Sequence, residues 1–558
     1  MDVTQGFAAT FVDELAAQGV EFACVSPGSR SAPLAMALQR HPRIKVLVQI
    51  DERCGSFFAV GLGKATGKPA VVLTTSGTAA VEVHAAVVEA SYSHTPLIVL
   101  TADRPPELQD VGANQAIDQQ HLYGTATRWF FDPGAPVDLP NAARAWRRLA
   151  ARAVAEAATG PVHVNLPFRE PLVPPPGEIP VADGASGQSV LDGRLLPSQA
   201  QVASLASALQ RSQRPLVVAG AMRDGERLAP ALKRLGLPVI AEPTSQLRRM
   251  ETGAAVESSE ALLRAGWSLE HGPDLVVRMG ATPTSRVLNR WLAAAAALTF
   301  VIDPDRAWRD EDHVATNVLA CDAQPLLEAL PTIDRSAWRE EWLDAGKRAS
   351  AAIAATLVST PMHEGHVVKA LSNRMPDAGQ AFIGSSMPIR AADSFWPLSR
   401  NQQRFYANRG ASGIDGLVSS GLGVATGRDP APTVLLLGDL SLYHDMNGLW
   451  AMQRHGVKAT LVICDNNGGG VFDFLPQAEH PDVFEEIFVT PLNLDLSQVA
   501  RLYGLVYSPV SDRSGLEPAI ADAMSAPTPT MVVVKMKRED SVSGHRLCWE
   551  AAASALKA

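Results

Sequence analysis

Short apolar segments alternate with helical stretches along most of the chain. Each segment is rich in β-branched residues and lacks the strict apolar–polar alternation of a half-exposed strand: Lys45–Ile50, Ala70–Leu73, Leu97–Leu100, Pro215–Val218, Leu275–Val277, Leu298–Ile302, Thr433–Leu437, Thr460–Cys464 and Thr530–Val534. Strands of this kind are typical of parallel sheets that are buried on both faces. The pattern therefore predicts an α/β protein with doubly wound parallel sheets.

Two segments rich in proline and glycine indicate where this pattern divides. They run from Pro171 to Gly187 and, less clearly, from Leu357 to Gly365 after an alanine-rich helical stretch. A chain of 558 residues is also too long for a single core. We therefore expect three domains, at residues 1–185, 186–350 and 351–558.

A seven-residue motif occurs in both outer domains. Gly61 to Gly67 reads Gly-Leu-Gly-Lys-Ala-Thr-Gly, and Gly421 to Gly427 differs from it only by a valine in place of the lysine. Each copy is followed by a predicted strand and a glycine turn. Chance similarity between glycine- and alanine-rich segments is the alternative, but the matching context favours a duplication, and duplicated halves predict a site shared between them.

Composition and charge exclude several classes of protein. The net charge of −9 argues against a surface that binds nucleic acid or an anionic membrane. The five cysteines are scattered without a CxxC spacing, which is typical of reduced thiols. The start of the chain lacks the features of a signal peptide, and no apolar run reaches the roughly 18 residues of a membrane span. We expect a cytoplasmic protein.

Candidate metal ligands follow two predicted strands of the third domain. Val434–Asp439 is a buried strand that ends in glycine and a carboxylate, and Thr460–Cys464 is followed by Asp465-Asn466-Asn467-Gly468. Adjacent strands of a parallel sheet bring such residues to the same edge. Their oxygen atoms suit Mg²⁺, which holds a diphosphate without a basic patch. Helix capping is the alternative role for Asp439 and Asn466 taken singly.

The spacing of these two residues resembles the signature of thiamin diphosphate enzymes. Asp439 precedes Asn466 by 466 − 439 = 27 residues. Leu440 stands where those enzymes usually have a second glycine, and Asp465 replaces the first asparagine. The resemblance implies that Asp439, Asn466 and the carbonyl of Gly468 bind Mg²⁺, with Mn²⁺ as an alternative metal.

Thiamin chemistry also needs a carboxylic acid beside the aminopyrimidine ring, and Glu52 is the candidate. A carboxyl group hydrogen-bonded to the ring nitrogen favours the imino form, which takes the proton from the thiazolium carbon, and burial helps by raising the carboxyl pKa. Glu52 follows the predicted strand Lys45–Ile50 and begins a helical stretch. An acid at a helix start is more commonly there to balance the helix dipole.

Further motifs make the resemblance specific. They are Ser26–Ser31, Asp51–Arg53, Thr75–Thr78, Thr101–Glu107, Gly112–Gln115, Asn408–Gly416 and Gly438–Tyr443. All of them resemble the MenD family of the menaquinone pathway, which is similar to this chain across both outer domains and only weakly so in the middle one. The sequence Gly-Asp-Leu at 438–440 is typical of that family, so Leu440 supports the resemblance.

The resemblance implies an activity and a set of site residues. The family joins 2-oxoglutarate to isochorismate with loss of CO₂, and the first and third domains bind the pyrimidine and the diphosphate of the cofactor. The positions implied to face the substrates are Ser29, Arg30, Arg104, Asn114, Gln115, Ser386, Arg390 and Arg409. Those implied to bind the cofactor are Glu52, Ser76, Gly77, Ser386, Met387, Ile414, Gly438, Asp439, Leu440, Ser441, Asn466, Val471 and Phe472. For Ile414 and Phe472, plain core packing is the alternative.

Other predictions concern the assembly and the middle domain. The family's site lies between the first domain of one subunit and the third of another, which implies a homodimer or homotetramer. We expect the middle domain to be a scaffold, and an acidic regulator near Arg278 and Arg306 is a hypothesis that rests on charge alone. A different thiamin-dependent decarboxylase or carboligase, similar to acetolactate synthase, and a non-catalytic regulatory paralogue are the alternative functions.

Overall fold

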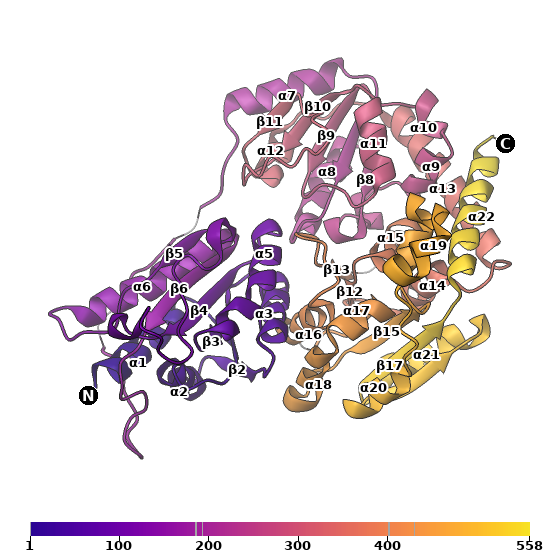
Figure 1. Cartoon of the computed structure of the whole chain (residues 1–558). Helices are drawn as coiled ribbons and strands as arrows, with labels where there is room; N and C mark the ends of the chain where they lie inside the picture. The colour runs from indigo at the N-terminus through magenta and orange to yellow at the C-terminus, as the bar shows by residue number, and fades with distance from the viewer. Residues whose placement is uncertain (1, 185–186, 192, 400–401, 429, 558) are drawn as a thin grey trace.

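The computed structural model describes residues 2–184, 187–191, 193–399, 402–428 and 430–557. Within those residues the chain forms three parallel sheets with helices packed on both faces (Figure 1). In this view the first region (residues 2–167) lies at the lower left, the middle region (199–329) at the top and the third region (336–557) on the right. The predicted class, α/β with three doubly wound parallel sheets, is confirmed.

The first region has a six-stranded sheet with the order β2-β1-β3-β4-β6-β5. Its strands are β1 (Phe22–Val25), β2 (Lys45–Val48), β3 (Ala70–Thr74), β4 (Leu97–Asp103), β5 (Trp129–Phe131) and β6 (Pro161–Pro167). Its helices are α1 (Val3–Ala17), α2 (Ala32–Arg40), α3 (Glu52–Thr66), α4 (Thr78–Glu82), α5 (His84–Tyr92) and α6 (Ala142–Glu156). The central strands β3, β4 and β6 are buried throughout, as continuous apolar strands require.

The middle region has a five-stranded sheet with the order β11-β10-β9-β7-β8. Its strands are β7 (Pro215–Ala219), β8 (Val239–Ala241), β9 (Leu275–Met279), β10 (Leu298–Ile302) and β11 (Asn317–Leu319). Its helices are α7 (Gln199–Arg211), α8 (Ala229–Leu235), α9 (Ser259–Arg264), α10 (Trp267–Glu270), α11 (Arg286–Ala294) and α12 (Ala323–Ala329). Read from β8 and renumbered from its own first strand, this order is 2-1-3-4-5, which shares its first four places with the first sheet but has no sixth strand among the described residues.

The third region repeats the strand order of the first. Its sheet runs β13-β12-β14-β15-β17-β16, which becomes 2-1-3-4-6-5 when renumbered from its own first strand. Its strands are β12 (Gln380–Ile383), β13 (Arg404–Tyr406), β14 (Thr433–Gly438), β15 (Thr460–Asp465), β16 (Val506–Val510) and β17 (Thr530–Lys535). Its helices are α13 (Ser336–Leu357), α14 (Glu364–Arg374), α15 (Met387–Phe395), α16 (Leu417–Gly427), α17 (Asp439–His444), α18 (Trp450–His455), α19 (Pro481–Val483), α20 (Leu496–Leu502), α21 (Arg513–Ser525) and α22 (Arg538–Lys557).

The two copies of the seven-residue motif lie on α3 and α16, which pack directly against each other. A Cβ placed on Gly61 would lie 2.0 Å from the carbonyl oxygen of Ser420, and one on Gly423 would lie 2.1 Å from that of Phe58. The helices approach so closely that only glycine fits at the crossing. The shared strand order and this contact both support the duplication that the motif predicts.

The register of the third sheet positions the predicted metal ligands. Gly438 on β14 is level with Cys464 on β15, so Asp439 and Asn466 emerge next to each other at the carboxyl edge. The adjoining pair is Asp465 on β15 and Lys535 on β17. The fold therefore brings the ends of two neighbouring strands together where parallel α/β sheets bind ligands.

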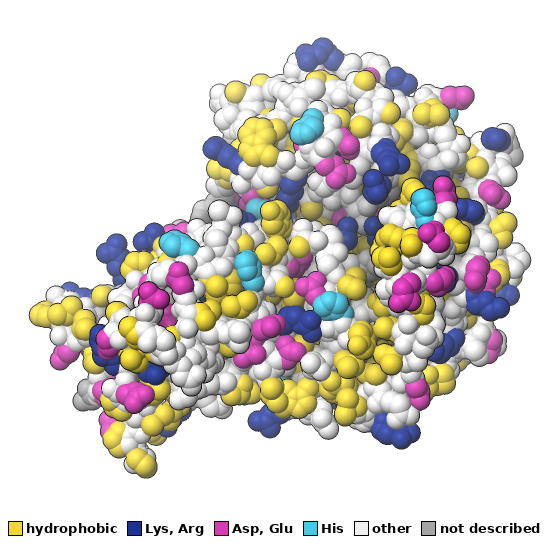
Figure 2. Space-filling model, viewed as in Figure 1, with side chains coloured by type: hydrophobic (Ala, Val, Ile, Leu, Met, Phe, Trp, Pro, Cys, Tyr) yellow, Lys and Arg dark blue, Asp and Glu magenta, His cyan; other side chains and the backbone are white. Residues whose placement is uncertain are grey.

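Several other predictions can be compared with the structure. All five cysteines are free and buried. No helix among the described residues is both long and apolar enough to cross a bilayer. Figure 2 shows Lys and Arg side chains scattered among Asp and Glu over the visible face. Of the predicted domain boundaries, the one at 185–186 lies outside the described residues and the one at 350–351 falls within α13, so both stay predictions.

Candidate active site

A cavity of about 370 Å³ opens at the carboxyl edge of the third sheet. It is lined by the predicted residues Ser386, Met387, Arg390, Arg409, Ile414, Gly438, Asp439, Leu440, Ser441, Asn466, Gly468, Val471 and Phe472. These residues come from the starts of α15 and α17, the segment between β13 and α16, and the segment after β15. The fold thus brings together all the predicted site residues of the third region.

Asp439 and Asn466 have the surroundings that a hard divalent cation requires. Asp439 begins α17, and burial raises the pKa of its carboxyl to about 6, with the neighbouring Asp465 adding to the rise. Asn466 Oδ1 is buried and has no hydrogen-bond partner. An orphaned amide oxygen beside a buried carboxylate matches the all-oxygen coordination of Mg²⁺. The residues present therefore fit a divalent metal.

Gly468 completes this group by its backbone. Its N–H donates to Asp439 Oδ2 at 2.8 Å, and its carbonyl accepts from Gly470 N at 3.0 Å, which leaves a second lone pair on the oxygen. A Cβ at this position would lie 2.5 Å from the carbonyl oxygen of Val489, and the φ of +141° also favours glycine. Close packing thus fixes the glycine at the position predicted to offer its carbonyl to the metal.

Asp465, which replaces the first asparagine of the thiamin signature, has a different partner. Its carboxylate forms an ion pair with Lys535 on the neighbouring strand β17. It does not line the cavity. The departure from the signature is therefore satisfied within the sheet and leaves Asn466 in place.

Two half-buried arginines, Arg390 and Arg409, line the same cavity. Arg390 donates from Nη1 to the carbonyl of Ser386 at 2.6 Å. Burial lowers the pKa of both Arg390 and Arg409, and the charge of Arg409 lowers that of Arg390 further. Two guanidinium groups that repel each other in a partly apolar cavity favour an anion between or beside them.

The backbone is strained at the start of α15. Ser386 has φ 69° and ψ −130°, a region that residues with a Cβ rarely adopt. Gln115 in the first region has a positive φ of 59°. Both are residues that the sequence predicts to face the substrates.

The predicted residues of the first region form a second group. Arg104 donates from Nη1 to Ser76 Oγ, Ser76 Oγ donates to the Gln115 carbonyl at 2.9 Å, and Gln115 Nε2 donates back to the Ser76 carbonyl at 2.9 Å. Gly77 N donates to Gln119 Oε1 at 3.0 Å. These bonds tie the turn after β3 to the segment after β4.

Arg30 belongs to the same group. It is buried, donates to the Phe168 carbonyl at 3.0 Å, and its charge helps burial to lower the pKa of Arg104. Ser29 and Asn114 are exposed. The first region thus has its own pair of arginines, with exposed polar residues near them in the sequence.

Glu52 begins α3, where the side chain of Asp51 caps the helix by accepting from Cys54 N at 3.1 Å. Glu52 is therefore not needed as the cap. Burial raises the pKa of its carboxyl, and the charges of Asp51 and Glu82 add to the rise. A raised pKa favours the protonated form, which is the form that can donate to a ring nitrogen.

The structure does not join the two groups within one chain. Among the described residues, those that line the cavity come from Glu364 to Leu475, and none belongs to the first region. Large apolar side chains are exposed near the predicted residues of the first region: Ile50, Val81, Leu108, Val111 and Ile117. An uncovered apolar surface next to half of a site is typical of a subunit interface.

Some residues at the site were not predicted. Glu364, Pro388, Ser412, Cys464, Gly469, Gly470 and Leu475 also line the cavity, and Glu82 influences the pKa of Glu52. Cys464, Gly469 and Gly470 adjoin the predicted ligands, so their proximity in sequence was a usable signal. Glu364 comes from the start of α14 and carries no such signal.

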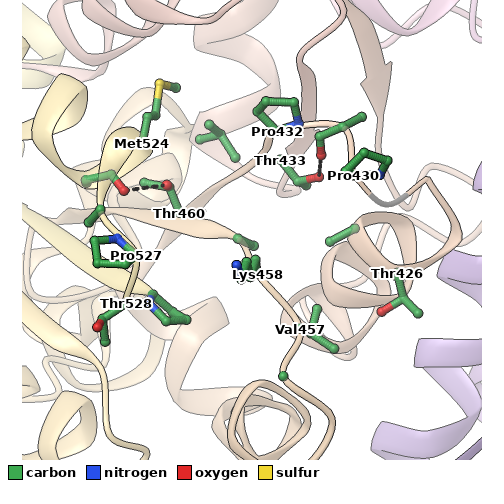
Figure 3. Close-up of a pocket in the computed structure, with 18 of the residues that line it drawn as sticks. Thr426, Pro430, Pro432, Thr433, Val457, Lys458, Thr460, Met524, Pro527 and Thr528 are labelled. Carbon is green, nitrogen blue, oxygen red and sulfur yellow. Dashed lines mark hydrogen bonds between the residues drawn. The ribbon is translucent and has the colours of Figure 1, made fainter.

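Two other features do not involve the predicted site. A cavity of about 430 Å³ lies at the opposite edge of the third sheet, where the Thr433 and Thr460 hydroxyls donate to backbone carbonyls (Figure 3). In the middle region, Arg278 forms an ion pair of 2.9 Å with Asp310, while Arg306 is exposed. An acidic regulator near these arginines stays a prediction.

Comparison with protein families assigns each region. Residues 6–122 match the model described as "Thiamine pyrophosphate enzyme, N-terminal TPP binding domain". Residues 196–383 match "Middle domain of thiamine pyrophosphate", and residues 386–534 match "Thiamine pyrophosphate enzyme, C-terminal TPP binding domain". The two cofactor-binding models thus match parts of the two regions that share a six-strand order.

Full-length relatives narrow the assignment. Proteins named 2-succinyl-5-enolpyruvyl-6-hydroxy-3-cyclohexene-1-carboxylate synthase are 41% identical in Geobacillus kaustophilus (strain HTA426), over 98% of this chain and 98% of the relative, and 40% identical in Geobacillus thermodenitrificans (strain NG80-2), over 98% and 95%. The protein of the same name from Haloarcula marismortui is 39% identical over 96% and 95%. This chain therefore belongs to the 2-succinyl-5-enolpyruvyl-6-hydroxy-3-cyclohexene-1-carboxylate synthase family of thiamin diphosphate enzymes.

Proposed function

We propose that the protein is a cytoplasmic enzyme of menaquinone biosynthesis that joins 2-oxoglutarate to isochorismate with loss of CO₂. The observation that carries this proposal is that Asp439 and Asn466 line the same cavity as two half-buried arginines, Arg390 and Arg409. The pair Asp439 and Asn466 suits a metal that anchors a diphosphate, and the two arginines suit a carboxylate substrate. The names of the relatives support the same reaction.

Thiamin diphosphate, when bound, supplies the electron sink for decarboxylation and carbon–carbon bond formation. We assign its metal to Asp439, Asn466 and the Gly468 carbonyl, with Mg²⁺ preferred and Mn²⁺ as an alternative. Gly438, Leu440 and Ser441 are then placed to contact the diphosphate. Ser76, Gly77, Met387, Ile414, Val471 and Phe472 complete the proposed cofactor site.

Glu52 has the role of holding a proton on its carboxyl oxygen for the aminopyrimidine nitrogen. Its raised pKa supports this role, because the shift favours the protonated carboxyl, which can donate a hydrogen bond to that atom. Asp51 caps the helix, so Glu52 is free for chemistry.

The arginines orient the substrates. Both proposed substrates are dicarboxylates, and guanidinium groups hold planar carboxylates in a fixed pose through paired hydrogen bonds. Arg390 and Arg409 provide this on one side, and Arg30 and Arg104 on the other. Ser29, Asn114, Gln115 and Ser386 are the proposed polar contacts around them.

The complete site is proposed to form between two copies of the chain, in a homodimer or a homotetramer. This follows from the separation of the two groups of site residues and from the exposed apolar side chains around Glu52, such as Ile50 and Val81. Packing this surface against the third region of a partner would cover the apolar side chains and bring Glu52 to the cavity.

One experiment tests the activity against its alternatives. Release of CO₂ from 2-oxoglutarate is measured with thiamin diphosphate and Mg²⁺, with and without isochorismate, and pyruvate replaces 2-oxoglutarate in a parallel reaction. We expect rapid release and consumption of isochorismate only when both proposed substrates are present. A preference for pyruvate would identify an enzyme similar to acetolactate synthase, and cofactor binding without turnover of either acid would indicate a regulatory paralogue.

A further inference from the structure

The segment between β13 and α16 carries Arg409, and the first region of the same chain holds it at several points. Lys64 Nζ donates to the Ala407 carbonyl at 3.1 Å. The backbone N–H of Gly410 donates to Glu89 Oε1 at 3.1 Å, and that of Ala411 donates to Glu89 Oε2 at 2.7 Å. The contacts therefore lie on both sides of Arg409.

Lys64 and Glu89 also bind each other. Lys64 Nζ lies 3.0 Å from Glu89 Oε1, and the side chains are 11% and 3% exposed. Lys64 belongs to the last turn of α3, and Glu89 lies in the middle of α5. Both helices belong to the first sheet's covering layer, so the segment around Arg409 is fixed to a rigid part of another region.

Burying these charges costs free energy, which their ion pair and hydrogen bonds must offset. A carboxylate loses a large hydration free energy when it leaves water, and apolar packing would join two regions without that penalty. Here both oxygens of Glu89 accept backbone N–H bonds from two consecutive residues, which fixes the orientation of the peptide unit between them. Gly410 permits the contact, because a Cβ there would lie 2.5 Å from the Glu89 carbonyl.

We propose that Glu89, supported by Lys64, is a positioning residue that sets the direction in which Arg409 presents its guanidinium to a substrate carboxylate. This inference rests on the proposed function, since it needs Arg409 to hold a substrate. Through this contact, the substrate site of the third region depends on how the first region of the same chain packs against the third. Glu89 itself does not line the cavity and touches no reacting atom.

A double-mutant cycle tests this role. Glu89→Gln removes the charge and places a donor where an acceptor is needed, so we expect KM to rise about tenfold to a hundredfold for the substrate that Arg409 holds. Arg409→Ala should raise KM for that same substrate. In the Arg409→Ala background, Glu89→Gln should change KM less than about threefold, because a residue that acts through Arg409 has nothing left to position.

Two controls separate positioning from loss of structure. The matched variant Glu156→Gln breaks an exposed ion pair with Arg152 on α6, and it should leave both KM values unchanged. The affinity for thiamin diphosphate with Mg²⁺ should be unchanged in Glu89→Gln. If Glu89→Gln does not fold, Glu89→Asp keeps the charge on a shorter side chain, and we expect it to raise the same KM by a smaller factor.

A readout that does not depend on turnover is hydrogen exchange. The amides of Gly410 and Ala411 should exchange faster in Glu89→Gln than in Glu156→Gln, while the amides of β14 should not change. Unchanged exchange at both amides, additive effects in the cycle, or an effect on the other substrate only would each overturn the inference. A wild-type protein without turnover would instead contradict the proposed function, and exchange would still report whether Glu89 holds the segment.

Discussion

The backbone N–H of Gly468 donates a hydrogen bond of 2.8 Å to Oδ2 of Asp439, and this bond links the residues that follow β14 and β15. The two strand ends are therefore already joined by protein atoms alone. A cation that binds there would meet oxygen ligands whose positions are restricted in advance, which reduces the entropy lost on binding.

Removal of the Asp439 carboxylate should abolish tight cofactor binding. We expect Asp439→Ala to weaken the affinity for thiamin diphosphate with Mg²⁺ by at least about 100-fold. Loss of a residue that only hydrogen-bonds to a metal ligand typically costs about 10- to 100-fold, and loss of the ligand itself should cost more. A titration followed by intrinsic fluorescence or calorimetry measures this. Asp465→Asn is the control, because its partner is Lys535, and it should change the affinity little. Similar losses in both variants would contradict the assignment.

Replacement of Glu52 should separate binding from turnover. Glu52→Gln keeps the size of the side chain and removes the acidic proton, so we expect kcat to fall by about 10²- to 10⁴-fold. The affinity for thiamin diphosphate with Mg²⁺ should stay within a few-fold of wild type. Steady-state kinetics and a binding titration measure the two quantities. Turnover near the wild-type rate would show that Glu52 does not have the proposed role.

The crossing of α3 and α16 should not tolerate a methyl group. Gly61→Ala would place a Cβ 2.0 Å from the Ser420 carbonyl oxygen, so the helices must separate, and we expect a loss of about 1–3 kcal/mol of stability or more. Denaturant unfolding measures the change. Gly184→Ala is the matched control, because a Cβ there meets nothing within 4 Å and the backbone has no positive φ. Equal effects would mean that the crossing is not close in solution.

Asp445 should make stability depend on pH. It is buried, accepts from Ser419 N at 2.7 Å, and burial raises its pKa from 3.8 to about 6. The folded chain thus binds this proton more tightly than the unfolded chain. The resulting stabilisation is present in full below about pH 4 and disappears as the pH rises through about 6, a change of about 3 kcal/mol.

The variant Asp445→Asn tests this pH dependence. Asparagine does not titrate, so the wild type should lose stability relative to the variant between pH 4 and pH 7. Unfolding midpoints of the two proteins, compared at each pH, cancel the titration of all other groups. A constant difference across this range would contradict the raised pKa.

The sequence predicted several central strands and the edge strand β2, but it missed the internal strands β1, β6 and β12 and most of the edge strands. Leu298–Ile302 has the predicted bounds, because a run of buried apolar residues has a clear beginning and end. Trp129–Phe131, Arg404–Tyr406 and Val506–Val510 lie at or next to sheet edges and were not predicted. Each of these segments is short or has polar and exposed positions. It becomes a strand by pairing with a neighbouring strand, and the local sequence pattern does not show that pairing.

The candidate site was predictable where its residues cluster in sequence. Asp439 and Asn466 could be related because one strand-to-strand connection separates them. The partner of Asp465 could not, because Lys535 is distant in sequence and only the register of β15 and β17 brings the pair together. Glu364 and Glu89 were missed for a similar reason, since each reaches its target from a helix that carries no recognisable motif.

The contact between α3 and α16 also helps to explain why the two copies of the motif are still similar in sequence. Gly61 and Gly423 each lie against the backbone of the opposite helix, and both already have the smallest possible side chain. A larger residue on one helix cannot be offset by a smaller one on the other. Neither glycine can be replaced alone. The equivalent residues Lys64 and Val424, at the fourth place of each motif copy, differ. The physical limit at the crossing therefore keeps one glycine in each copy of the motif, which supports the predicted duplication.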